Sequence, residues 1–109
     1  MKCYRLTVHV PEAHAEKLRQ ALWAVGAGRC GDKYDCCAFS TKGTGYFRPL
    51  KGANPAIGQV GVVEQVAEES VEFSVTADVV HGVIQAMKDA HPYEEIYYEL
   101  FELVDVNRL

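Results

Sequence analysis

The side chains best suited to chemistry gather in one short stretch, residues 90–95, which reads AHPYEE. An imidazole can ligate a metal or contact an anion, and a nearby carboxylate is a suitable second metal ligand, so His91 and Glu94 are candidate site residues. A structural interpretation competes with this one, in which His91 ends a helix that Pro92 prevents from continuing. Glu94 and Glu95 would then point to opposite faces of a following strand rather than form a carboxylate pair. The residue types alone leave both interpretations open.

A glycine-rich stretch, residues 40–49, reads STKGTGYFRP and suggests contact with an anion. It is not a phosphate-binding loop, because the G-x-x-x-x-G-K-[ST] order is missing and no helix is expected after the glycines. Two glycines beside Thr44 would still suit an anion-binding nest, and Arg48 could pair with a carboxylate or a phosphate. The structural alternative is a hairpin with its turn at 42–45 and an arginine on its outer strand.

Four cysteines, Cys3, Cys30, Cys36 and Cys37, suggest either a metal site or simple packing. Their spacing is not the C-x2-C pairing of structural zinc sites, and two adjacent cysteines in an expected strand would face opposite ways. Without a secretory signal, reduced thiols are expected. We therefore predict that Cys30, Cys36 and Cys37 are small buried apolar side chains. A soft-metal or redox site is the alternative.

The whole chain has 109 residues, which suits one domain spanning 1–109. Hydrophobic residues make up 49% and charged residues 24%, an ordinary globular composition. A net charge of −4 with no block of lysine and arginine argues against a nucleic-acid partner. The apolar runs are too short for a membrane span, and the start of the chain lacks the apolar core of a signal peptide. A cytoplasmic protein is therefore expected.

Apolar periodicity predicts the elements that position these residues. Residues 2–10 alternate with period 2, with Leu6, Val8 and Val10 on one face, as expected for a half-buried strand. Apolar stripes at helical spacing predict helices over 12–25 and 80–90, the second with Asp78 as its N-cap. Further strands are expected at 34–41, 46–50, 59–66, 69–77 and 93–104.

The order of these elements predicts the fold class. A weak internal echo supports two similar halves, because the pattern Leu18-x-Gln20-Ala21-Leu22 returns as Val83-x-Gln85-Ala86-Met87. Two such halves give an α+β, ferredoxin-like sandwich, an antiparallel sheet with both helices on one face. In that topology the start of the last strand lies near the end of the first. His9 and His91 are then expected to approach each other, with the turn around Gly43 at the same end of the sheet.

Four stretches in this order resemble a known family: GAGR at 26–29, FSTKGTGYFRP at 39–49, GANPAIG at 52–58 and AHPYEE at 90–95. Together they resemble the inserted domain of the NIF-three-like family, often labelled GTP cyclohydrolase type 2 or YqfO-like, over nearly the whole chain. The His-Pro-Tyr-Glu element is also similar to one in the CutA family of trimeric divalent-ion-tolerance proteins. The chain looks like a free-standing version of the insert.

The resemblance implies a PII-like, CutA-like fold that tends to associate in threes. In full-length family members the insert is embedded in a toroidal hexamer, and the two-metal centre there uses ligands from the surrounding domain. This chain has no His-His-Pro motif, so neither that centre nor a hydrolase activity can be carried over. The resemblance also makes one pocket lined by both motifs plausible.

These observations predict a non-enzymatic, oligomeric binding protein, expected to be a homotrimer, with no catalytic residue. Its small-molecule or divalent-metal site would lie between subunits, near the two motifs. His91 would contact a metal or an anion, Glu94 would be a second metal ligand, and Arg48 would clamp an anion beside Thr44. Association is suggested by apolar side chains on both faces of the last strand, namely Tyr97, Tyr98, Leu100, Phe101 and Leu103.

Two other functions remain open from the sequence. The chain could be an interaction module that docks on a separate partner protein, as the insert does within its larger relatives. A metal-assisted hydrolase ranks last, because no paired general acid and base can be named.

Overall fold

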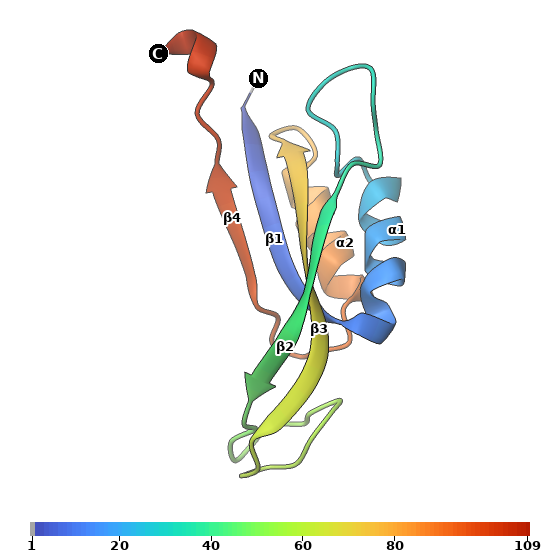
Figure 1. The fold of residues 1–109 in the computed structure, drawn as a ribbon, viewed down its shortest axis with the longest axis vertical. Helices are drawn as coiled ribbons and strands as arrows, with labels where there is room; N and C mark the ends of the chain where they lie inside the picture. The colour runs from blue at the N-terminus through green and yellow to red at the C-terminus, as the bar shows by residue number, and fades with distance from the viewer. Residues whose placement is uncertain (1) are drawn as a thin grey trace.

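The computed structural model describes residues 2–109 and shows one antiparallel sheet with two helices against one of its faces (Figure 1). The strands lie in the order β2-β3-β1-β4. Their bounds are Cys3–Pro11 for β1, Phe39–Phe47 for β2, Glu64–Thr76 for β3 and Tyr98–Glu102 for β4. The helices are α1, Ala15–Ala24, and α2, Val80–Ala90, with short 3-10 turns at Glu12–His14 and Val106–Arg108. The predicted α+β, ferredoxin-like fold is confirmed.

The first strand lies in the middle of the sheet because its alternation gives it one fully apolar face. Leu6, Val8 and Val10 are completely buried. β1 pairs antiparallel with β3 on one side, with Leu6 opposite Phe73, and with β4 on the other, with Leu6 opposite Leu100. The predicted period of 2 over this segment is therefore confirmed.

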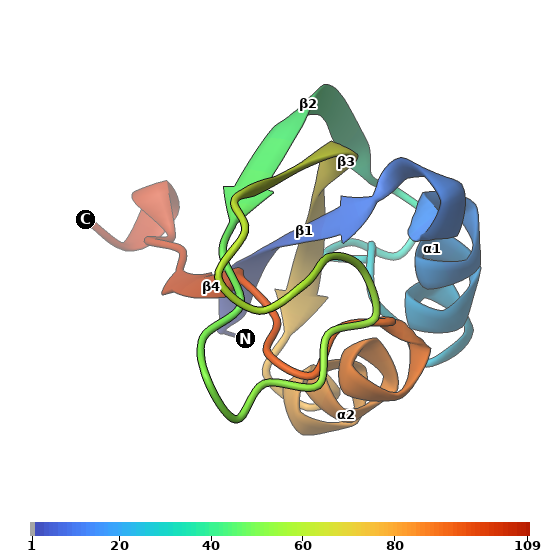
Figure 2. The ribbon, with the colours of Figure 1, turned by 90° about the horizontal axis from the view of Figure 1, so that it is seen from below.

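The core lies between this face of the sheet and the two helices, which Figure 2 shows side by side on one flank of the sheet. α1 contributes Leu18 and Leu22, and α2 contributes Val83 and Met87, all fully buried. Burying each such side chain contributes about 1.5–3 kcal/mol. An ion pair also ties α1 to β3, because the Arg19 guanidinium lies 2.7 Å from the buried Glu69 carboxylate.

The largest correction to the predicted elements concerns the middle of the chain. The strands expected at 59–66 and 69–77 are replaced by one long strand, β3, which begins only at Glu64. The turn expected at 42–45 and the start of the strand expected at 46–50 both lie inside β2, which ends at Phe47. The ladder runs without a break from Phe39 opposite Glu72 to Phe47 opposite Glu64. Two glycines in close succession are usually a turn signal. Here both glycines are instead paired with β3, and Gly45 leaves room for a side chain of that strand.

Smaller corrections concern the ends of elements. β2 begins at Phe39 and β4 at Tyr98, so the strands expected from 34 and 93 are shorter than predicted. The first helix opens with a 3-10 turn, and the second has the predicted bounds, Val80–Ala90. Asp78 is not its N-cap: Val79 occupies that position without a side-chain cap, and the Asp78 carboxylate instead accepts a hydrogen bond from the Thr76 hydroxyl.

Among the residues described, no helix is long and apolar enough to cross a membrane.

Candidate functional site

His91 lies at the end of α2 and is only 7% exposed. Its Nε2 atom is 2.7 Å from the His9 carbonyl oxygen, and its Nδ1 atom accepts a hydrogen bond from the Tyr93 backbone N–H at 3.1 Å. Because a carbonyl can only accept, Nε2 carries the proton and Nδ1 the lone pair. The expected approach of His9 and His91 is confirmed, as a contact between the ring of one and the backbone of the other.

Burial lowers the pKa of His91, and this outweighs the opposing effects of the His9 carbonyl and the Glu68 carboxylate. The neutral ring is therefore the favoured form in the folded protein. Both ring nitrogens are already engaged by backbone groups. A metal or a ligand could reach this imidazole only by displacing one of them.

Tyr93 connects the two predicted motifs. Its hydroxyl donates to the Glu68 carboxylate at 3.2 Å, and its ring packs edge-on against Phe47 with centroids 5.7 Å apart. Burial, with the Glu68 carboxylate adding to it, raises the pKa of Tyr93 to about 12. Tyr93 is therefore a protonated phenol near neutral pH, and it acts as a hydrogen-bond donor.

Gly45 is the point where the glycine-rich stretch meets this network. A Cβ atom at Gly45 would lie 2.0 Å from a carboxylate oxygen of Glu68. A glycine therefore leaves the space that the Glu68 side chain occupies on β3, while Glu68 accepts from Tyr93. We call this cluster of Gly45, Glu68, His91, Tyr93 and Glu94 the motif junction.

Glu94 completes the motif junction from the exposed side. Its carboxylate accepts a hydrogen bond from the Asn54 backbone N–H at 2.9 Å. That contact joins the segment after α2 to the long β2–β3 loop, residues 48–63, and Figure 2 shows the two passing close to each other. Glu94, like His91, is thus engaged by a backbone group.

Thr44 and Arg48 lie apart from this network. Both are exposed, and within residues 2–109 neither side chain forms a hydrogen bond or an ion pair. Thr44 neighbours Gly45 in a strand, so its side chain points to the opposite face from the Glu68 carboxylate. The expected anion-binding nest is not formed, because Gly43 and Gly45 are both extended residues of β2 rather than residues of a turn.

The role of Glu68 and its hydrogen bond with Tyr93 could not be found by inspecting motifs. Glu68 was expected between two strands, and its partner Tyr93 lies 25 positions away in the sequence. The one available signal is an acidic pair, Glu68 and Glu69, in the middle of an otherwise alternating segment.

Across residues 2–109, no three histidine, cysteine, aspartate or glutamate side chains are grouped so as to hold a metal ion.

The prediction that three cysteines are buried is wrong. Cys30, Cys36 and Cys37 are exposed, and Cys3 is half-buried. The reason is that β2 begins only at Phe39, so that residues 28–38, here called the cysteine loop, run outside the sheet.

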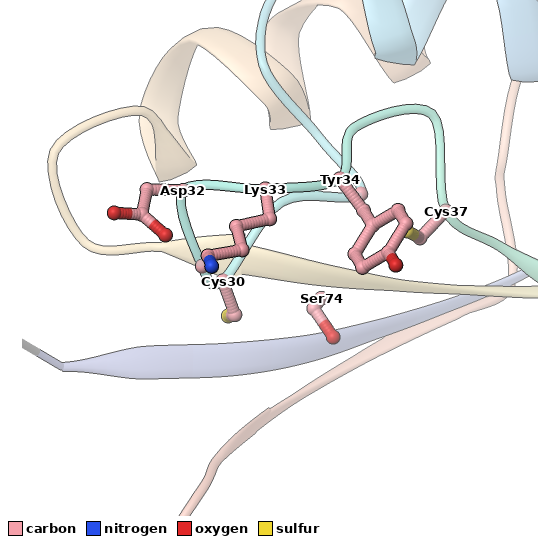
Figure 3. Close-up of a pocket in the computed structure, with 8 residues that line it drawn as sticks. Cys30, Asp32, Lys33, Tyr34, Cys37 and Ser74 are labelled. Carbon is pink, nitrogen blue, oxygen red and sulfur yellow. The ribbon is translucent and has the colours of Figure 1, made fainter.

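The base of the cysteine loop is fixed by backbone hydrogen bonds. Gly28 N–H donates to the Ser74 carbonyl at 2.7 Å, and Cys37 N–H donates to the Gly28 carbonyl at 3.1 Å. The loop encloses an open hollow of about 380 Å³, lined by Cys30, Tyr34, Cys37 and Ser74 among others (Figure 3). A second hollow, of about 260 Å³, adjoins it and shares Cys37 and Ser74.

No protein-family model matches the chain. A GTP cyclohydrolase 1 type 2 homolog of Halalkalibacterium halodurans is 44% identical over 102 residues, which are 94% of this chain and 27% of that protein. The Bacillus subtilis homolog of the same name is 45% identical over 89% of this chain and 26% of its own length. This chain is a relative of one segment of these proteins. It spans about a quarter of the length of the curated relatives it matches, and the predicted resemblance is confirmed.

Solved structures agree with this relationship. The Bacillus cereus protein related to NIF3 aligns with a TM-score of 0.80 and 39% identity, covering 95% of this chain and 26% of that one. CutA from Synechococcus elongatus aligns at 0.66 with 19% identity over 94% of this chain and 78% of that one. GlnK of Bacillus subtilis, solved as an ATP complex, aligns at 0.62 with 13% identity over 94% and 82%. At such low identity the last two show the fold alone.

Proposed function

We propose that the chain is a non-enzymatic binding module that associates with copies of itself, as a homotrimer, through β4 and the residues after it. The observation behind this proposal is a run of apolar side chains that are 37% to 69% exposed: Tyr97, Tyr98, Leu100, Phe101, Leu103 and Val104. Tyr98, Leu100 and Phe101 lie on both faces of this edge strand, and the other three residues flank it in the chain. Apolar surface of this kind, with unpaired ladder groups beside it, favours contact with another chain. The number three comes from the resemblance to PII- and CutA-like domains.

Association is tested by native mass spectrometry over a range of concentrations. A trimer is expected for the wild type, and a monomer for the double variant Leu103→Glu, Val104→Glu. The matched control, Val62→Glu with Val63→Glu, adds the same charge to exposed valines of the β2–β3 loop and is expected to remain a trimer. A wild type that is monomeric at every concentration, or a Leu103→Glu, Val104→Glu variant that remains a trimer, would refute association through β4 and the residues after it.

The ligand in this proposal is a small anion, held by Arg48 with help from the Thr44 hydroxyl. Arg48 is an exposed cation without a partner in residues 2–109, in a chain of net charge −4. It follows Phe47, whose ring is fixed against Tyr93, and it opens the loop that Glu94 anchors. A guanidinium on such a fixed support suits a carboxylate or a phosphate.

ATP and inorganic phosphate are suitable probes, because GlnK has been solved with ATP and both carry phosphate oxygens. Titration calorimetry is expected to show binding that weakens at least tenfold in Arg48→Gln, equivalent to about 1.4 kcal/mol. The control Lys51→Gln removes one nearby exposed cation and is expected to change affinity less than twofold. If neither probe binds the wild type, the anion part of the proposal fails, whatever the oligomeric state.

Metal ligation by His91 and Glu94 stays a prediction, and it requires the imidazole to exchange a backbone partner for the ion. Native mass spectrometry before and after chelation decides it. Extra mass that chelator and His91→Ala both remove would support a divalent metal at the motif junction. The same mass in all samples would leave His91 with its structural role.

Docking on a separate protein is the second candidate, and one observation favours it. In its relatives the matching segment is only about a quarter of the chain, so there it is joined to a larger body. The β4 surface would then face that body. If the wild type is monomeric when pure, loss of a captured partner in the Leu103→Glu, Val104→Glu variant would support docking over self-association.

A further inference from the structure

Two cysteine thiols are in contact at the other end of the sheet from the motif junction. The Sγ atoms of Cys3 and Cys30 are 2.7 Å apart, and both residues are free thiols. A disulfide bond joins sulfurs at about 2.05 Å. The two thiols are therefore already in contact, and a small side-chain movement would bring them to bonding distance.

Backbone hydrogen bonds hold Cys3 and anchor the chain two residues before Cys30. Cys3 lies in the ladder opposite Thr76, and its carbonyl accepts from the Leu103 N–H at 2.9 Å. Cys30 lies two residues after Gly28, whose N–H donates to the Ser74 carbonyl at 2.7 Å. The approach of the sulfurs is thus set by β1, β3 and the base of the cysteine loop rather than by its exposed tip.

We propose that Cys3 and Cys30 form a reversible disulfide by exchange with low-mass disulfides such as oxidised glutathione, and that this bond locks the cysteine loop. The proposal goes beyond the binding function above and does not depend on it. Cys30 is one wall of the larger hollow, and in Figure 3 its sulfur points toward the same side of the ribbon as the Ser74 hydroxyl. Oxidation would fix that wall to β1.

The exchange takes place in two steps. The exposed Cys30 first loses its proton, and its thiolate attacks one sulfur of the reagent, forming a mixed disulfide and releasing one thiolate. Cys3 then loses its proton, and its thiolate attacks the Cys30 sulfur and expels the second thiolate. The two protons end on the two reagent thiols, so the protein is oxidised by two electrons and the reagent is reduced by two.

The environment of the pair sets the pH at which this happens. Although Cys30 is exposed as a residue, partial desolvation of its thiol, reinforced by the contact with Cys3, raises the pKa of Cys30 to about 11. Only the thiolate attacks, so little of Cys30 is in the reactive form near pH 7. The initial rate is expected to rise about tenfold per pH unit between pH 7 and 9. This slow reaction at neutral pH suits a pair that responds to sustained oxidation.

The experiment uses the full chain and the double variant Cys36→Ser, Cys37→Ser, which keeps only the proposed pair. Each is incubated with oxidised glutathione at pH 8, quenched by alkylation, digested and mapped by mass spectrometry. Loss of two hydrogen atoms, with a peptide joining Cys3 to Cys30 and full reversal by dithiothreitol, is expected in both. Cys30→Ser is expected to lose this link. Glutathione adducts without the link in the double variant, or a wild-type link only to Cys36 or Cys37, would overturn the proposal.

Two further measurements on the oxidised double variant test the lock. The bond joins residues 27 positions apart, so oxidation is expected to raise Tm by about 10 °C. Amide hydrogen exchange across residues 29–36 is expected to slow at least tenfold. A disulfide that forms while exchange in the loop is unchanged would overturn the lock, because the loop would then be no more rigid than before.

Discussion

The two ends of the sheet use reactive side chains in opposite ways. At the motif junction, an imidazole, a phenol and two carboxylates are engaged with one another and with the backbone, and His91 has no free nitrogen. At the cysteine loop, side chains that resembled packing residues are exposed around an open hollow, with two thiols in contact. A suggestive residue type therefore indicates chemistry only when the fold leaves its reactive atom free.

The largest expected effect is on the cysteine loop. Gly28 has φ +82°, and a Cβ there would lie 2.3 Å from the Cys37 carbonyl oxygen, a backbone atom that cannot rotate away. Gly28→Ala is expected to lower the free energy of unfolding by about 4 kcal/mol, from the left-handed strain together with the clash. Gly52→Ala is the control, since it also has positive φ but open space around it. Urea denaturation measures both.

Equal losses in these two variants would mean that strain alone acts, and that the base of the cysteine loop is not fixed. The comparison between the two ends of the sheet would then lose one of its supports.

The next effect tests the structural role of His91. His91→Ala removes two hydrogen bonds and leaves a gap beside Tyr93, so a loss of about 3 kcal/mol is expected. His81→Ala, at an exposed position of α2, is expected to change stability by less than about 0.5 kcal/mol. Chemical denaturation measures the loss. A His91 variant as stable as the wild type would mean that the ring is free to serve a ligand, and the contrast between the ends would disappear.

A smaller effect is expected at Gly45. Gly45→Ala forces the Glu68 carboxylate to move and breaks its bond with Tyr93, so a loss of about 1.5 kcal/mol is expected. Gly43→Ala is the matched control, two residues away in the same strand with open space at its Cβ position. Thermal unfolding with scanning calorimetry separates the two. Equal changes would show that β2 penalises any side chain here, and that Glu68 does not explain the glycine.

The smallest effect concerns pH. The pKa of His91 is lowered in the folded protein, so the unfolded chain binds its proton more readily near pH 6.5. The contribution of neutral His91 is present above that pH and declines as pH falls through 6.5 toward the lowered value. His91→Gln is expected to flatten the dependence of stability on pH between 7 and 5. A steeper slope in His91→Gln would contradict the assignment.

The sequence predicts the layers of this fold well because its strongest patterns are local. The alternation in Leu6, Val8 and Val10 and the stripe containing Val83 and Met87 each report one buried face, and the structure buries both. Gly45 is different, because its reason lies on another strand and in Tyr93, far away in the sequence. A glycine that marks a turn and a glycine that leaves space for a carboxylate cannot be told apart from one sequence.

The predicted burial of the cysteines is wrong for a related reason. Cysteine is among the most often buried residue types, and Cys36 and Cys37 fall in a segment that the sequence predicts to be a strand. Where β2 actually begins is decided by pairing with β3, with Phe39 opposite Glu72. The candidate site was partly predictable. The approach of His91 to His9 follows from the topology, but the backbone groups that bind the two ring nitrogens of His91 can be identified only from the structure.

The position of the first strand has a consequence for synthesis on the ribosome. β1 is made first, yet it lies in the centre of the sheet, between β3 and β4. On one side β1 pairs with residues Glu68 to Thr76 of β3, and on the other side it pairs with residues Tyr98 to Glu102 of β4. The central strand therefore leaves the exit tunnel long before either neighbour exists, and the hydrogen-bonding groups along both of its edges stay unpaired until most of the described chain has been translated.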